Sequence, residues 1–240
     1  MSPTRLLSIA LSFAAVVYPA TTTAQMIQGT SAYLQFSDSP FSSLNFSYFW
    51  LENFEDHLFN VPGVTASAGG VTSVVFGPSI HDSVDGDDGV IDGSGLNGES
   101  FFSNSGPTGI TFTFNAAALG GLPTHAGLVW TDGVNPIFFE AFDGLGNSLG
   151  TLTGQHANAS FSGETAEDRF YGAIHAGGIA RIFIRNGAAG IEIDHLQYGL
   201  GAATVVPEPA TLVLLGTGLL AVAAIRRRRT HRHHQRPIPC

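Results

Sequence analysis

The 240-residue chain contains no lysine, one cysteine and only two methionines, and charged residues make up 12% of it. The one cysteine is Cys240, the last residue, so an intrachain disulfide is excluded and the fold must rely on packing. The chain also lacks a His-Glu-x-x-His pair and a phosphate-binding loop. With no cysteine nucleophile in the central region and no such motif, we expect a protein that is not an enzyme.

Basic residues are scarce except at the two ends of the chain. Between Gln25 and Thr204 there are three arginines and 18 acidic residues, a formal net charge of −15. A domain this acidic is repelled by nucleic-acid phosphates, so we expect no nucleic-acid partner. The acidity suits a soluble extracellular domain that either takes up divalent cations or simply keeps its surface solvated.

The N-terminus has the pattern of a secretory signal peptide. Arg5 precedes an apolar run from Leu6 to Val17, and small residues lead to a cleavage site between Ala24 and Gln25, with Ala20 as the alternative. We therefore expect a signal helix over residues 1–24 and an exported domain over residues 25–204.

The C-terminus has three parts in a fixed order, namely a Pro-Glu-Pro segment, an apolar run from Leu212 to Ile225, and an arginine cluster. The run is short for a membrane-spanning helix, but snorkelling arginine stems extend its reach. Because arginines after the run stay on the cytoplasmic side, we expect a transmembrane helix with the domain outside and residues 230–240 as a cytoplasmic tail. The residues of this pattern are Pro207, Glu208, Pro209, Arg226, Arg227, Arg228 and Arg229.

This order resembles the PEP-CTERM sorting signal, over residues 205–229. The resemblance implies an exosortase-type processing enzyme as partner, recognition and cleavage near Pro207–Pro209, and an arginine stop at Arg226–Arg229. It further implies a precursor anchored in the inner membrane of a Gram-negative bacterium. The mature domain would then reside at the cell envelope or in the extracellular matrix.

The central region alternates short apolar runs with Gly, Asn, Asp and Pro, which predicts an all-β fold. We expect a two-sheet antiparallel sandwich, most plausibly a jelly roll, with one helical turn at Asn115–Leu119. An irregularity is expected in the last strand. The predicted strands are Asn45–Leu51, Val71–Phe76, Ile110–Phe114, Ala126–Thr131, Ile137–Phe142, Ser148–Thr153, Phe170–Ile174, Ile179–Arg185 and Gly190–Tyr198.

Three segments, at residues 121–127, 165–170 and 190–196, resemble ectodomains that accompany this sorting signal and look like the jelly rolls of carbohydrate-binding modules. This resemblance implies a fold more than an activity. Our first interpretation of the whole chain is a non-enzymatic surface or matrix protein, released by processing and retained in extracellular polysaccharide, with glycan binding as one form of that association. The alternative is a secreted glycoside-active hydrolase on the same scaffold. An exposed aromatic platform would favour the first, and a cleft with two facing carboxylates the second.

Acidic residues between His81 and Gly93 form the candidate metal site, with five carboxylates in eleven residues. Their hard oxygens and the intervening glycines suit Ca²⁺, although the spacing is not that of an EF-hand. A solvated acidic turn is the alternative. A second hypothesis, from the jelly-roll resemblance, places a structural Ca²⁺ between the acids of the first strand, Glu52, Glu55 and Asp56, and those of the last strand, Glu192 and Asp194. The residues of the first site are Asp82, Asp85, Asp87, Asp88 and Asp92.

Overall fold

The computed structural model describes residues 23–72, 82–160 and 162–201. The expected signal helix, the Pro-Glu-Pro segment, the apolar run, the arginine cluster and the tail all lie outside these residues. Within them, no helix has the length and apolar character needed to cross a membrane. The chain forms one compact unit up to Gly201, and residues 202–240 are assigned to a second unit.

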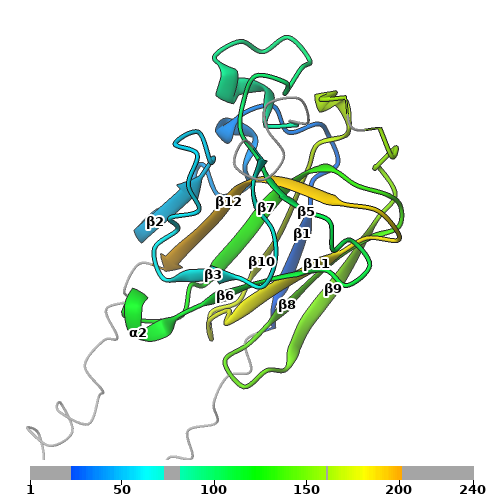
Figure 1. The fold of residues 1–240 in the computed structure, drawn as a ribbon. Helices are drawn as coiled ribbons and strands as arrows, with labels where there is room; N and C mark the ends of the chain where they lie inside the picture. The colour runs from blue at the N-terminus through cyan, green and yellow to red at the C-terminus, as the bar shows by residue number, and fades with distance from the viewer. Residues whose placement is uncertain (1–22, 73–81, 161, 202–240) are drawn as a thin grey trace, which may run out of the picture. The chain divides into compact units, whose positions relative to one another are not determined.

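The described part of the chain is an antiparallel β-sandwich of two sheets (Figure 1). The first sheet has the order β1-β10-β7-β12-β5-β4, with β2 also paired to β12, and the second has the order β3-β6-β11-β8-β9. The all-β, two-sheet prediction is confirmed, whereas the jelly-roll order stays a prediction. The strands are β1 Gln25–Gln28, β2 Phe46–Glu52, β3 Val64–Ala66, β4 Gly70–Val71, β5 Phe101–Ser103, β6 Ile110–Phe114, β7 His125–Asp132, β8 Ile137–Phe142, β9 Ser148–Gly154, β10 Arg169–Ile174, β11 Arg181–Arg185 and β12 Ile191–Gly201.

Helical structure among the described residues is limited to short pieces. These are the 3₁₀ turns η1 (Phe36–Asp38), η2 (Asp85–Asp88) and η3 (Thr165–Glu167), and the α-helical turn α2 (Ala116–Leu119). The side chain of Asn115 caps α2 by accepting hydrogen bonds from the amides of Ala117 and Ala118. The helical turn expected at Asn115–Leu119 is therefore confirmed.

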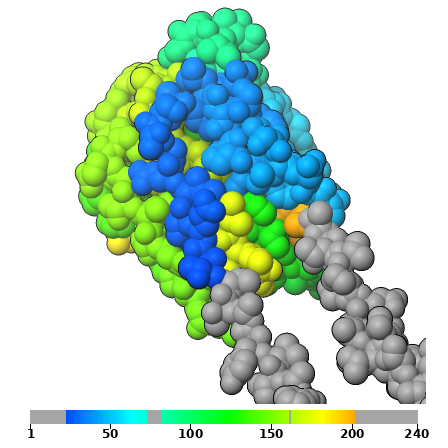
Figure 2. Space-filling model, turned by 180° about the vertical axis from the view of Figure 1, so that it is seen from behind, coloured from blue at the N-terminus to red at the C-terminus, as the bar shows by residue number. Residues whose placement is uncertain are grey.

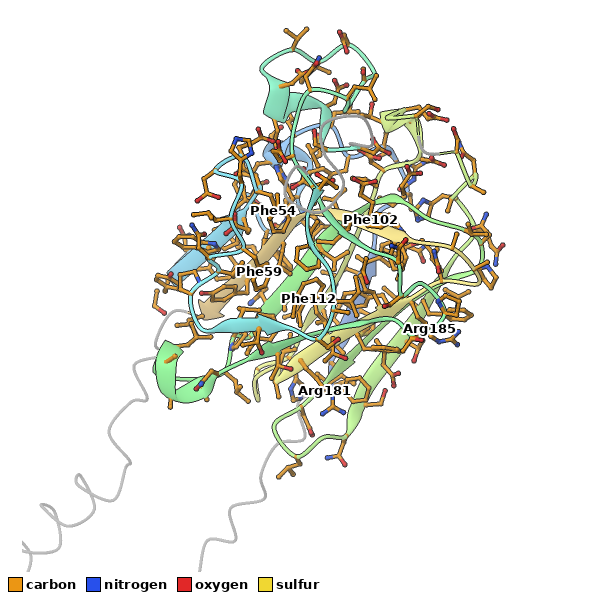
Figure 3. All side chains as sticks on the ribbon, viewed as in Figure 1. Phe54, Phe59, Phe102, Phe112, Arg181 and Arg185 are labelled. Atoms are coloured by element: carbon orange, nitrogen blue, oxygen red, sulfur yellow. The ribbon has the colours of Figure 1, made fainter. Side chains whose placement is uncertain are left out.

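The second sheet has one buried face and one solvent face, as the alternating sequence predicts. In β11, Ile182 and Ile184 are buried, while Arg181, Phe183 and Arg185 on the other face are half-buried. The inward residues meet those of the first sheet in one apolar core, because side chains on successive strand positions point to opposite faces. Figure 3 labels Phe54, Phe59 and Phe112 in this core region.

The central strands β10, β7 and β12 of the first sheet are buried on both faces. The inner face of this sheet contributes Leu128 and Trp130 to the core, while Val129 and Phe170 pack on the outer side with Tyr33 and Phe41. The residues between β1 and β2 supply this cover, which lies in blue across the rear of the molecule (Figure 2). This explains why every residue of β7 after His125 is buried.

Strand β12 has the expected irregularity. Its register against β7 shifts between Glu192 and Ile193 and again between Asp194 and Gln197, and His195 has a left-handed φ of 45°. Such a bulge redirects side chains. Here it lies in the acidic stretch of β12, beside the end of β7 and close to η2 and η3 at one end of the sandwich (Figure 1).

Candidate metal centre

Acidic side chains from four separate segments meet at this end of the sandwich. Asp132 is the last residue of β7, and the register of the first sheet places Glu192 of β12 opposite it. Glu167 ends η3 and Asp168 follows it. Asp82 begins the long loop that carries η2. Strand pairing and loop closure, not nearness in sequence, bring these carboxylates together.

The tightest group is Asp82, Asp132 and Glu167, which we call the carboxylate cluster. Their ligand oxygens all lie within 4.8 Å of one another. Asp82 and Asp132 are each 1% exposed and Glu167 is 6% exposed. Three carboxylates so close together and so shielded repel one another strongly unless a cation or protons offset their charge.

Most oxygens of this region have no hydrogen-bond partner among the described residues. Both carboxylate oxygens of Asp82, Asp132 and Asp168 are buried without a partner, as are one oxygen of Glu167 and one of Glu192. A buried carboxylate oxygen is normally bonded, because leaving it without a partner costs the full desolvation of that group. The cluster therefore contains several buried carboxylate oxygens to which no donor group is bonded.

The remaining oxygens hold the site to the scaffold. Glu167 Oε2 accepts the amide of Asn158 at 2.8 Å, and Glu192 Oε1 accepts the amide of Asp82 at 3.3 Å and the hydroxyl of Ser100. The backbone carbonyl of Asp132 accepts the indole N–H of Trp130 at 2.9 Å. The acids are thus fixed in place while their other oxygens stay open.

Burial raises the pKa of every member of this group. The pKa of Asp82 rises to about 9, through burial and then the charge of Asp132, and that of Asp132 rises to about 8, through burial and then Glu192. Burial also raises the pKa of Glu167 and of Glu192 to about 7, and it raises the pKa of Asp168 well above its usual range. Without a cation these groups resist ionisation at neutral pH.

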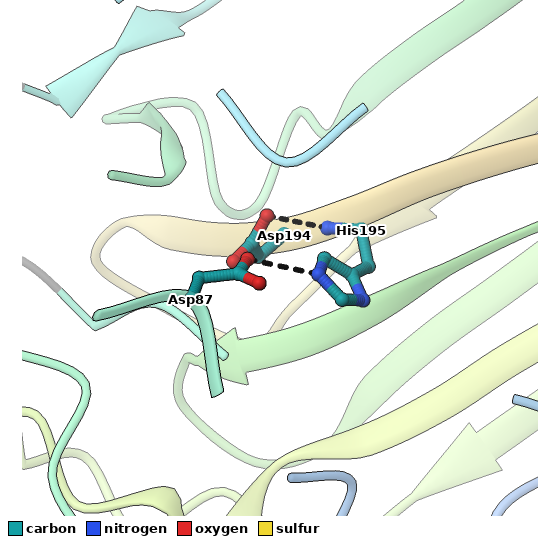
Figure 4. Close-up of side chains that lie close together, drawn as sticks. All are labelled: Asp87, Asp194 and His195. Carbon is teal, nitrogen blue, oxygen red and sulfur yellow. Dashed lines mark hydrogen bonds and ion pairs between the residues drawn. The ribbon is translucent and has the colours of Figure 1, made fainter. Parts of the chain in front are cut away.

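A second group, Asp87, Asp194 and His195, lies nearby and is closed by internal hydrogen bonds (Figure 4). His195 Nε2 contacts Asp87 Oδ2 at 2.8 Å, and its Nδ1 contacts the hydroxyl of Tyr33 at 2.9 Å. Asp194 accepts the amides of Val84 at 2.8 Å and His195 at 2.5 Å. These bonds tie η2 to β12, so this group has a structural role already.

The acids predicted from the His81–Gly93 segment do not gather in one place. Asp82 joins the carboxylate cluster and Asp87 joins the second group. Asp85 accepts the amides of Asp92 and Gly93, which shapes its own loop. Asp88 accepts the amide of Val90, and Asp92 is exposed.

The residues of the second hypothesis are also divided, since Glu192 lies opposite Asp132, Asp194 belongs to the second group, and Glu52 belongs to neither group. Glu52 accepts the amide of Phe54 at 3.1 Å and the indole N–H of Trp50 at 3.2 Å. The sequence hypotheses did not include Asp132, Glu167 and Asp168 among the candidate metal ligands, and the structure places these three acids close to Asp82. Their only local signal is an acid at a strand end, as in Asp132-Gly133 and in Glu167-Asp168 before β10.

These carboxylates do not form the open cleft that a glycoside hydrolase requires, since the oxygens of the cluster are buried. Residues Gly146–Gly150 match the Gly-x-Ser-x-Gly pattern of hydrolases, but here the pattern does not occupy the structural position that it has in those enzymes. Ser148 is exposed at the start of β9, in the hairpin after β8, and not at a strand-to-helix elbow. Neither feature favours the hydrolase alternative.

The outer face of the second sheet carries two of the three arginines of the ectodomain. The guanidinium of Arg181 lies 4.0 Å from the ring centre of Phe142, and that of Arg185 lies 3.8 Å from the ring centre of Phe138. In Figure 3 both arginines are labelled on β11. Among the described residues neither arginine forms an ion pair within 4.0 Å, although Glu140 of β8 lies opposite Phe183, between them, on the same face.

A polar pocket opens beside β1 and β10, away from this face. Its volume is about 450 Å³. Burial, and then the charge of Arg169, lower the pKa of His156 to about 4, so its imidazole is neutral at physiological pH. Arg169 donates to the backbone carbonyls of Ala166 and Asp168 and not to a carboxylate. The lining residues are Gln28, Gly29, Thr30, Gln155, His156 and Arg169.

Comparison with known proteins identifies the C-terminal segment. Residues 205–229 match the PEP-CTERM protein-sorting motif. The chain carries a PEP-CTERM sorting signal. The match spans the positions expected from sequence, from Pro207, Glu208 and Pro209 to Arg226–Arg229. No curated protein and no solved structure matches the chain.

The PEP-CTERM motif bears on how the protein is sorted and not on what its β-sandwich does. The motif indicates an exported protein that is anchored at the membrane and then processed by an exosortase. The chain is therefore a substrate of that chemistry. What the β-sandwich does after sorting must be argued from its own surface and interior.

Proposed function

We propose that this PEP-CTERM protein is a non-enzymatic surface or matrix protein, retained in extracellular polysaccharide by the outer face of its second sheet. The mature domain would reside at the cell envelope or in the extracellular matrix of a Gram-negative bacterium. The observation that supports this most is the pair of arginines stacked on phenylalanine rings, Arg181 on Phe142 and Arg185 on Phe138.

Stacking prepares these guanidiniums for anionic ligands. A ring under the flat face of a guanidinium holds it in place and leaves its N–H edges available, so less side-chain entropy is lost on binding. The two side chains are four residues apart on β11, or about 13 Å along the strand. Carboxylates of an acidic polysaccharide are the partners that this geometry suits, through paired N–H···O bonds.

The rest of the ectodomain would oppose such binding, because its formal net charge is −15. Attraction to an acidic polysaccharide must therefore come from a local patch. On this face the half-buried Phe183 and Thr111 beside the arginines add apolar and hydroxyl groups suited to a sugar ring. We expect binding that is weak per site and strengthened by the repeated units of a polymer.

The test compares how variants of the full-length gene partition in the native host between the polysaccharide fraction and the medium. Arg181→Gln with Arg185→Gln should lower retention about tenfold, and retention of the unchanged protein should fall as salt is raised. Ser43→Asp with Asn45→Asp is the matched control, since it makes the same change in net charge at exposed positions before β2. Equal retention of the arginine variant and the unchanged protein would contradict the proposal.

A further inference from the structure

We propose that the carboxylate cluster binds a calcium ion, with Asp82, Asp132 and Glu167 as ligands and Asp168 and Glu192 completing the acidic shell. The site is separate from the outer face of the second sheet, so this inference does not depend on polysaccharide binding. It differs from the sequence hypothesis, because its ligands come from the ends of strands and from η3 and not from one acidic loop.

The spacing of the ligand atoms fits one ion. Calcium–oxygen distances are about 2.3–2.6 Å, so two oxygens on opposite sides of one ion are separated by about 4.6–5.2 Å. The ligand oxygens of Asp82, Asp132 and Glu167 lie within 4.8 Å of one another. A single Ca²⁺ can therefore contact all three side chains without displacement of the backbone.

The unbonded carboxylate oxygens are an independent argument for a ligand. Asp82, Asp132 and Asp168 are each at least 99% buried, and none of their six carboxylate oxygens accepts a hydrogen bond from a donor group of the described residues, although a shared proton would link Asp132 to Glu167. The surrounding backbone supplies bonds to other oxygens of the region, such as Glu167 Oε2 and Glu192 Oε1. The unsatisfied oxygens are thus the ones that a cation would occupy.

The donor set selects the type of ion. All candidate ligands are carboxylate oxygens, which hard cations prefer, and no sulfur or nitrogen ligand is part of the cluster. His195, in the second group, has both ring nitrogens engaged by Tyr33 and Asp87. A site formed by several buried carboxylates suits Ca²⁺ better than Mg²⁺, which usually keeps several waters.

Calcium at this position would fasten the loops to the sandwich. Asp82 belongs to the loop that carries η2, Glu167 to η3 and Asp132 to β7. An ion that contacts all three joins segments separated by 85 positions in the chain, from Asp82 to Glu167. The fold would then be stable in a calcium-containing exterior and weaker where calcium is scarce, in a chain that can form no internal disulfide.

The test is calcium binding by the full-length chain in detergent, measured by calorimetric titration and by thermal unfolding with CaCl₂ or with chelator at pH 7.5. A hundredfold excess of Ca²⁺ over its dissociation constant should raise the melting temperature of the unchanged protein by about 5–10 °C. Asp82→Asn and Asp132→Asn should each weaken binding at least tenfold. Asp92→Asn, an exposed acid of the same loop, should behave like the unchanged protein.

A further result separates lost binding from lost folding. In chelator, Asp132→Asn should melt at the same temperature as the unchanged protein or higher, since an amide, unlike the acid, can carry no buried charge that would repel the neighbouring carboxylates. Loss of the calcium response without loss of calcium-free stability is the signature expected of a ligand. If the unchanged protein shows no heat of binding and no calcium-dependent melting, the carboxylates are kept protonated instead and the proposal is overturned.

Discussion

Trp130 links the core to the carboxylate cluster, and its replacement by phenylalanine gives a quantitative test of the structure. Trp130 is fully buried, its indole N–H donates to the carbonyl of Asp132 at 2.9 Å, and its ring meets Tyr171 edge-on with centres 6.0 Å apart. Trp130→Phe removes this hydrogen bond, at a cost of about 1 kcal/mol. The smaller ring also leaves a cavity that costs about 1–2 kcal/mol more. The expected loss of unfolding free energy is about 2–3 kcal/mol, or about 5–10 °C in melting temperature.

The other tryptophan of the chain is a matched control. Trp50 is only partly buried, and its indole N–H also reaches two residues ahead, to Glu52 at 3.2 Å. Trp50→Phe should cost about 1 kcal/mol or less, because little apolar area is lost and water can replace the hydrogen bond. Urea unfolding of the two variants, followed by the fluorescence of the remaining tryptophan, measures both values. Equal losses for the two variants would refute the placement of Trp130.

Two further predictions concern titration and packing. Burial raises the pKa of Glu55 from 4.5 to about 7, so the folded state binds the proton of this side chain more tightly than the unfolded state does. The folded state therefore loses stability as the pH rises from about 4.5 through 7. Glu55→Gln keeps an acceptor for the amide of Glu99 and should raise the melting temperature at pH 8 more than at pH 5. Gly127→Ala should lower the unfolding free energy in urea by about 2 kcal/mol or more, since its Cβ would lie 2.5 Å from the ring of Phe170 and 2.7 Å from the carbonyl of Tyr171. Stability unchanged by either substitution would contradict the packing described around that residue.

Most of the fold could be predicted from local pattern. Strands β6 and β8 have the predicted bounds, because apolar and polar residues alternate cleanly between marked turns. Strands β1, β3 and β5 were missed, since they have only three or four residues and no periodicity can be read over that length. Burial of the outer face of the first sheet was also not predictable, because it depends on where the segment between β1 and β2 packs.

The candidate site was predictable only in part, for a physical reason. The sequence places Asp82 in a stretch rich in carboxylates, which correctly identifies an acidic region. Its partners Asp132 and Glu167 are more than 30 positions apart in the chain, and only strand register and the position of η3 bring them together. Two of the acids that cluster in sequence are engaged by their own loop, Asp85 by the amides of Asp92 and Gly93 and Asp88 by the amide of Val90.

The PEP-CTERM motif implies that the β-sandwich is exported and then separated from the C-terminal sorting segment. The most direct test of this processing is the intact mass of the mature protein purified from its native cell envelope. We expect a mass that lacks residues 1–24 and everything beyond the Pro207–Pro209 region, with any added mass at that end marking covalent attachment. A mass that retains the apolar run Leu212–Ile225 and the arginines after it would contradict processing and leave a plain membrane-anchored ectodomain.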